Sequence, residues 1–225
     1  AKFATGGLNA SVEFAKNFGE DRTLANNTQF KGYALQLKAG YKLDLSDVGM
    51  INPWGEWGMG SGDSNFDYAG NNNFQAINSD YRPGGIYGRF DAGSASVLGN
   101  AVTTANGAIA NFNGSSNGLS NRIIWGVGVK TTPSALNKLT VGVAYYKYAF
   151  HRVAPSTVAG ALTTKTSRNI GSEVNVTGEW KHSENVSLKA TAGTFKPGAY
   201  VTDLRGANAA LNPAVMLAGD VAIKF

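Results

Sequence analysis

Apolar and polar residues alternate with a period of two over most of the chain, and this period is typical of β-strands rather than helices. From Tyr33 to Asp44, apolar or aromatic side chains occupy every second position, and Lys38 and Lys42 lie between them. The segment RIIWGVGVK, residues 122–130, repeats the pattern. In all, the alternation predicts about eight strands. They lie within residues 8–15, 33–44, 51–60, 122–130, 139–146, 171–181, 186–198 and 215–225.

Pro53 interrupts the third of these segments. Proline has no backbone N–H to donate to a neighbouring strand, so it is found mainly at strand starts and on edge strands. We therefore expect Pro53 at the start of a strand or at an edge of the sheet.

The connections between the predicted strands alternate in length. Short, turn-like connections lie at residues 45–49, 131–137 and 182–185. Longer ones, rich in Gly, Asn, Ser and Ala, lie near residues 19–28, 62–120, 153–168 and 197–212. Short turns at one end and long loops at the other are typical of outer-membrane β-barrels, whose strands cross the bilayer in about ten residues.

We therefore expect an all-β fold, an antiparallel transmembrane β-barrel of about eight strands in a bacterial outer membrane. Residues 1–225 would form one domain, with short periplasmic turns and a long extracellular loop at about 62–120. An aromatic residue, Phe225, ends the last predicted strand and is similar to the terminal signal that the outer-membrane assembly machinery reads.

Tyrosine and tryptophan fall near the predicted strand ends or on the apolar side of the strands, as in the aromatic girdles of membrane barrels. These residues are Tyr33, Tyr41, Trp54, Trp57, Trp125, Tyr145 and Trp180. A soluble β-sandwich or a lipocalin-like barrel also alternates, and it is the alternative to a membrane barrel.

The other side of nearly every strand carries charge, and in a membrane barrel this side faces the lumen. The expected lumen-lining residues are Glu13, Lys38, Lys42, Glu56, Arg122, Lys130, Glu173, Glu179, Lys189, Asp220 and Lys224. One interpretation is a polar channel whose cations, which include Lys181, favour anions. The other is a network of paired charges that fills a narrow barrel, since eight strands leave an interior that side chains can just fill.

The long segment 62–120 is a second candidate site. Loops of this length are uncommon without a role. Four of its side chains would suit a sugar or an anion: Tyr81, Arg82, Tyr87 and Arg89. The segment could fold inward as a constriction or cap the barrel, and the alternative is a surface loop without a binding role.

The amino-acid composition argues against several other classes of protein. The chain has no Cys, which excludes a disulfide scaffold and thiolate chemistry. Its net charge of +5 is spread without a basic run, so we expect no nucleic-acid partner. No apolar run reaches the length of about 18 residues that a membrane-spanning helix needs. No signal peptide is visible behind Ala1.

The sequence shows no convincing metal or catalytic site. His151 and His182 are the only histidines, and zinc needs more protein ligands than these. Asp63, Asn65 and Asp67 resemble the start of a calcium loop, but the twelfth position is Phe74 rather than Glu. We expect no metal, no cofactor and no enzymatic activity.

Three segments carry a resemblance to a known family. They are GSEVNVTGEWKHSENVSLKATAGTFKPGAYV from Gly171, FKGYALQLKAGYKLD from Phe30 and WGEWGMGSGD from Trp54. They resemble strands and turns of the alginate-export porin family. The resemblance weakens in residues 70–120 and 153–168, and it implies an outer-membrane porin that passes anionic polysaccharide or other polar solutes. Outer-membrane lipid, lipopolysaccharide and the assembly machinery would be its partners.

Members of that family are longer and close with more strands. This chain is then a compact relative, a C-terminal portion of a larger barrel, or one piece of an assembly with a partner chain. Pairing between residues 7–18 and 213–225 would mark a closed small barrel. The expected function is a porin-like channel for passive transport of polar or anionic solutes. The alternative is a non-conducting barrel that anchors loops for adhesion, recognition or assembly.

Overall fold

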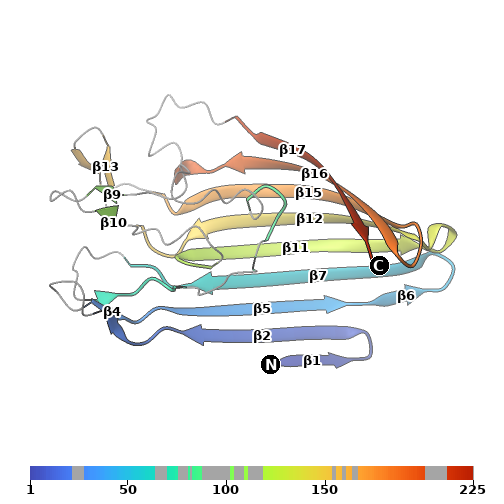
Figure 1. Ribbon diagram of the computed structural model, residues 1–225, viewed down its shortest axis with the longest axis horizontal. Helices are drawn as coiled ribbons and strands as arrows, with labels where there is room; N and C mark the ends of the chain where they lie inside the picture. The colour runs from blue at the N-terminus through green and yellow to red at the C-terminus, as the bar shows by residue number, and fades with distance from the viewer. Residues whose placement is uncertain are drawn as a thin grey trace.

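The chain forms an all-β structure around one antiparallel sheet of ten strands (Figure 1). The computed structural model describes residues 1–21, 28–63, 70–75, 81, 83–87, 102–103, 109–110, 119–153, 156–158, 161–163, 167–200 and 212–224. The strand order of the main sheet is β1-β2-β5-β7-β11-β12-β15-β16-β17, and β6 also pairs with β7. Along this path, the strands follow one another in the order in which they occur in the chain.

The strands of the main sheet have the following bounds: β1 (Lys2–Thr5), β2 (Leu8–Lys16), β5 (Tyr33–Tyr41), β6 (Leu43–Leu45), β7 (Gly49–Gly60), β11 (Arg122–Pro133), β12 (Leu139–Phe150), β15 (Asn169–Lys181), β16 (Val186–Pro197) and β17 (Ala214–Ile223). A short 3-10 helix, Ser134–Leu136, joins β11 to β12. Among the described residues, no helix is long and apolar enough to span a membrane.

Shorter strands form small sheets in the connections. One contains β3 (Glu20–Asp21), β4 (Thr28–Phe30) and β8 (Gly70–Asn71). The others are the pairs β9 (Val102–Thr103) with β10 (Ile109–Ala110), and β13 (Ser156–Val158) with β14 (Ala161–Thr163).

All eight predicted strands are present, and the antiparallel all-β prediction is confirmed. The count of eight was too low because the sheet also contains β1 and β6. The strand β1 forms a hairpin with β2 through Gly6 and Gly7, which have φ values of 51° and 88°. Two such glycines between strands are a hairpin signal that the alternation alone did not reveal.

Pro53 lies in the middle of a central strand, so the expectation of a strand start or an edge was wrong. On one side Pro53 is paired in register with Val129 of β11. On the other side, pairing of β7 with β5 ends at Trp54, and pairing with β6 begins at Ile51. Proline is accommodated there because the ladder between neighbouring strands is interrupted beside it.

The two ends of the sheet differ in their connections, as the alternation of loop lengths predicted. The short connections, at residues 46–48, 134–138 and 182–185, meet at the right-hand end in Figure 1. The long connections leave the opposite end.

The two faces of the sheet differ in chemistry because side chains alternate along each strand. The apolar face carries bulky hydrophobic residues that include Val12, Leu37, Trp57, Trp125, Tyr145, Val174 and Leu217. Many of its side chains are more than half exposed, including Trp125 at 57% and Leu217 at 84%. The polar face carries Lys38, Glu56, Lys130, Tyr146, Glu173, Lys189 and Asp220.

The buried core lies on the polar face, towards the end with the long connections. Ile124, Tyr148 and Phe150 belong to strands and are fully buried. Tyr87 and Leu119, which belong to the long connection between β7 and β11, pack with them. The connection therefore covers part of the polar face, whereas the apolar face stays open.

The strands β1 and β17 are the edges of the main sheet. Among the described residues, β17 pairs only with β16, and β1 pairs only with β2. The pairing of residues 7–18 with 213–225, which would mark a closed small barrel, is not among the described pairs.

Because the long connection covers the polar face, alanine substitutions at two glycines of β7 should differ in their effect on stability. A Cβ added at Gly60 would lie 1.9 Å from the backbone oxygen of Leu119, whereas one added at Gly55 on the apolar face would meet nothing closer than 3.7 Å. Gly60→Ala should therefore lower the free energy of unfolding by about 1–3 kcal/mol through overpacking. Gly55→Ala, the matched control, should be near neutral in the same denaturant titration. Equal stability of the two variants would contradict this arrangement of the connection.

Candidate functional site

The carboxylate of Glu173 fixes a turn of the long connection onto the polar face. This turn, residues 83–87, is called the inward turn below. Oε1 of Glu173 accepts the backbone N–H groups of Gly85 and Ile86 at 2.6 and 2.7 Å, and Oε2 accepts that of Tyr87 at 2.9 Å. Glu173 is only 1% exposed, so these charge-assisted bonds replace its hydration.

Glycine is required where the inward turn meets the sheet. Gly84 has a φ of 84°, a conformation that side chains other than glycine rarely adopt. A Cβ there would also lie 2.2 Å from the hydroxyl of Tyr148 and 2.8 Å from Oε2 of Glu173. The dipeptide Gly84–Gly85 thus lets the backbone approach the sheet closely.

Aromatic packing and Arg122 hold the other side of the turn. The rings of Tyr87 and Tyr148 stack with centroids 4.0 Å apart. Nε of Arg122 donates to the hydroxyl of Tyr87 at 2.6 Å, and the guanidinium lies 4.4 Å from the centroid of the Phe150 ring. Since Arg122 is 2% exposed, it secures the connection and is not open to a solute.

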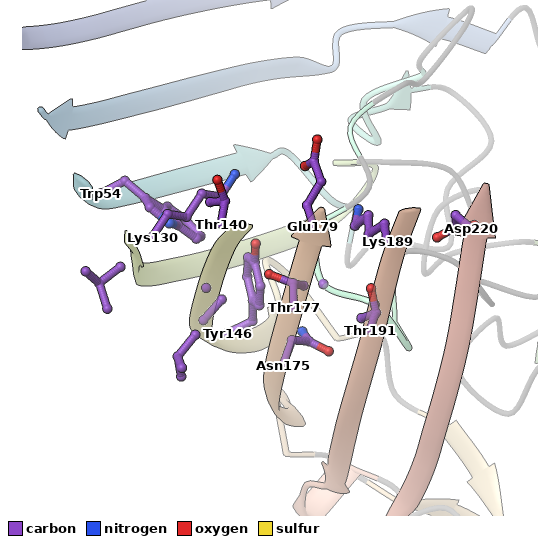
Figure 2. Close-up of a pocket in the computed structure, with 16 residues that line it drawn as sticks. Trp54, Lys130, Thr140, Tyr146, Asn175, Thr177, Glu179, Lys189, Thr191 and Asp220 are labelled. Atoms are coloured by element: carbon purple, nitrogen blue, oxygen red, sulfur yellow. The ribbon is translucent and has the colours of Figure 1, made fainter. Parts of the chain in front are cut away.

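A polar cavity of about 460 Å³ lies beside the inward turn. Gly84 and Gly85 border it, and the rest of its wall comes from β7, β11, β12, β15, β16 and β17. Figure 2 shows the labelled side chains around it: Trp54, Lys130, Thr140, Tyr146, Asn175, Thr177, Glu179, Lys189, Thr191 and Asp220. The inward turn therefore divides the polar face into a covered part and an open cavity.

Charges of opposite sign neighbour one another on the polar face. Lys189 on β16 is the register partner of Glu179 on β15 and of Asp220 on β17. Farther along the sheet, Nζ of Lys38 lies 3.7 Å from Oε2 of Glu56. It also lies 5.1 Å from the centroid of the Tyr81 ring. The polar face thus offers mixed charge rather than a field of one sign.

The predicted lumen-lining residues fall into three groups. Lys130, Glu179, Lys189 and Asp220 line the cavity. Arg122 and Glu173 are buried beneath the inward turn and the neighbouring connection. The remaining five lie elsewhere along the polar side or at strand ends: Glu13, Lys38, Lys42, Glu56 and Lys224.

The predicted loop site is described only in part. Tyr87 belongs to the buried cluster of the polar face, and Tyr81 packs against that cluster. Arg82, Arg89, Asn65, Asp67 and Phe225 lie outside the described residues. Asp63, the first residue of the calcium-like motif, accepts the backbone N–H of Asn72 at 2.8 Å. Within the described part of the chain, no cluster of His, Asp and Glu side chains could hold a metal ion.

Sequence reasoning placed Trp54 with the girdle aromatics, and this was wrong. Trp54 lies in the middle of β7 on the polar face, with its ring centroid 5.9 Å from that of Tyr146. The sequence did contain this information, since Trp54 lies two residues before Glu56 and therefore points to the same face of the strand. Asn175 and Thr191 also line the cavity, and they were missed because uncharged polar residues did not stand out in the alternation.

His151 joins two of the long connections just beyond β12. Its Nδ1 accepts the backbone N–H of Gly62 at 3.1 Å. The neighbouring backbone N–H of Arg152 donates to Oδ1 of Asn121 at 2.8 Å. Burial lowers the pKa of His151, and the positive charges of Arg152 and Arg168 lower it further. His151 is therefore neutral in this arrangement, as an acceptor for Gly62 must be.

A scan against protein-family models gives no match to this chain, and a search of curated protein sequences gives none either. The two faces of the sheet and the residues of the cavity are therefore the features that bear on function.

The bonds to Glu173 predict that its carboxylate controls the inward turn. Glu173→Gln removes the charge that strengthens three backbone bonds, each worth about 1.5–3 kcal/mol when the acceptor is ionised. Hydrogen exchange of the Gly85, Ile86 and Tyr87 amides should accelerate at least about tenfold, which corresponds to about 1.4 kcal/mol. Glu179→Gln on the same strand is the matched control. Unchanged exchange in Glu173→Gln would show that the turn is held by other contacts.

The neutral state of His151 predicts acid sensitivity. Because the pKa in the folded protein is below the ordinary value of 6.5, the unfolded chain binds the proton more readily. The contribution of His151 to stability is complete above pH 6.5 and is lost as pH falls through the lowered pKa. Denaturant titrations at pH 7.5 and pH 5 should show this loss in the wild type. His151→Asn should show a smaller loss, and an identical loss in both proteins would contradict the assignment.

Proposed function

We propose that the main sheet is part of the wall of a transmembrane β-barrel in a bacterial outer membrane, and that it acts as a porin-like channel. The observation that carries this proposal is the contrast between its faces. Bulky hydrophobic side chains are exposed from β2 to β17 on one face, while charge gathers on the other. A soluble sheet buries its apolar face, whereas a membrane barrel turns that face towards lipid.

Strand length supports the same proposal. Most strands of the main sheet are 9 to 13 residues long. A tilted strand needs about 9–11 residues to cross the hydrocarbon core of a bilayer. The apolar face then contacts outer-membrane lipid and lipopolysaccharide, and the assembly machinery inserts the barrel.

The two edges of the sheet set a condition on the proposal. Unpaired backbone N–H and C=O groups are not tolerated in the hydrocarbon region, so a spanning sheet must close. In the membrane, β1 and β17 are therefore paired, either with each other or with further strands of the same wall. A wall with more strands than this sheet also leaves more room for a solute.

The proposed cargo is polar or anionic, as in the alginate-export porins that the sequence resembles. Lys130 and Lys189 line the cavity, and Lys38 is 47% exposed at its side chain. Side-chain cations along a pore attract anions and set selectivity. Arg122 is excluded from this role by its burial.

A second candidate function is a non-conducting barrel that anchors loops for adhesion, recognition or assembly. One observation favours it: the inward turn and the buried cluster around Tyr87, Tyr148 and Phe195 occupy the polar face at the long-connection end. Such packing resembles a plug rather than an open pore.

Conductance in planar bilayers separates the two functions. Purified protein should give stable current steps, and its reversal potential in a salt gradient measures the selectivity between anions and cations. The double variant Lys130→Gln with Lys189→Gln should shift that potential towards cations, because two lumen charges are lost. Lys147→Gln is the control, since Lys147 lies on the opposite face of β12. Absence of current would reject the channel and support the anchoring function.

A further inference from the structure

Asn175 presents a buried amide to the cavity beside the inward turn. It lies on the polar face of β15 and is only 4% exposed. Its Nδ2 and Oδ1 atoms are both buried, and among the described residues neither has a hydrogen-bond partner. Buried polar groups are nearly always paired, so each exception calls for an explanation. Because Asn175 lines the cavity, a group that both donates and accepts hydrogen bonds would satisfy it from there.

Trp54 brings a second unsatisfied group and an aromatic surface to the same cavity. Its indole Nε1 is buried without a partner among the described residues. The indole lies against Gly128, where an added Cβ would be 2.7 Å from two of its ring atoms. Tyr146 stands next to it and also lines the cavity. The absence of a side chain at Gly128 thus makes room for an indole on the wall.

The remaining polar groups of the cavity carry balanced charge. Lys130 and Lys189 are offset by Glu179 and Asp220. Thr177 and Thr191 add hydroxyl groups to the wall. A cavity without excess positive charge does not select an anion, and its hydroxyl and amide groups match a ligand rich in hydroxyls.

We propose that this cavity is a binding site for a neutral carbohydrate unit. The sugar hydroxyls pair with the amide of Asn175 and with Nε1 of Trp54, and the apolar face of the sugar ring packs on the aromatic wall. A volume of about 460 Å³ falls within the usual range for ligand pockets. The inference rests on the proposed function, since a solute in the channel would reach this face.

The inward turn is part of this site. Gly85 borders the cavity, and a Cβ there would lie 2.8 Å from Oδ1 of Asn175. The Glu173 carboxylate, which binds the N–H of Gly85, therefore also sets the position of one wall. Occupation of the cavity should stabilise the turn, because a ligand that binds one arrangement favours it.

Equilibrium binding to the whole purified protein in detergent micelles tests the proposal. The probes are maltotriose, mannotriose and galactotriose as neutral trisaccharides, and trigalacturonate as the anionic counterpart. Calorimetry should detect binding of at least one neutral trisaccharide, and trigalacturonate should bind at least tenfold more weakly. Failure of all three neutral probes to bind would mean that the cavity holds water only, and equal or tighter binding of trigalacturonate would make the site anionic. Either result overturns the proposal.

Variants assign the binding to this cavity. Asn175→Leu and Trp54→Leu should each weaken binding of the neutral trisaccharide at least tenfold. Trp57→Leu, on the apolar face of the same strand, is the matched control and should bind as the wild type does. Thr191→Val keeps the side-chain volume, so it tests the hydroxyl even if a larger change prevents folding. Unchanged affinity in Asn175→Leu, Trp54→Leu and Thr191→Val would place the sugar elsewhere and overturn the assignment.

The site and the channel can fail separately. Binding without current in planar bilayers would retain the carbohydrate site and reject the channel. Current without binding would retain the channel and reject the site.

Discussion

A buried carboxylate is tolerated only when fixed donors replace the water it has lost, and Glu173 meets this condition through three backbone N–H groups. The donors belong to a connection far from β15 in the sequence, so the bond between them determines where that connection lies. The stacking of Tyr87 on Tyr148 and the bond from Arg122 to Tyr87 both require the turn in this place. The open cavity is the part of the polar face that the turn leaves uncovered.

The side chains of the polar face also depend on glycine residues in the neighbouring strands. An added Cβ at Gly126 would lie 2.7 Å from the ring of Tyr146, and one at Gly128 would lie 2.7 Å from the ring of Trp54. One at Gly193 would lie 2.4 Å from Oδ1 of Asn175. On the apolar face, by contrast, Gly178 and Gly219 have open space around them. Glycine therefore makes room for neighbouring side chains on the polar face and has no such role at these two positions of the face that is proposed to meet lipid.

The period of two was sufficient to predict eight of the ten main-sheet strands and the faces to which the charged residues belong. It was not sufficient for β1, which is only four residues long and depends on the turn at Gly6 and Gly7. Nor could it reveal the inward turn, because the bonds between residues 85–87 and Glu173 join segments 86 to 88 positions apart. The charges of Glu173 and Arg122 were recognised, but their burial follows from those distant contacts and not from local alternation.

The connection that covers the polar face also joins the pair of neighbouring main-sheet strands that lies farthest apart in the chain, β7 and β11. Closing a loop costs free energy that rises with the logarithm of its length. Relative to a tight hairpin, a loop roughly fifteen times longer costs about 2 kcal/mol more. The bonds from Glu173 and Arg122 to this loop offset that cost. The sheet should then fold as two blocks of strands that are close in the chain, β1 to β7 and β11 to β17. The long loop slows the joining of the two blocks, and its contacts with the polar face stabilise them once joined.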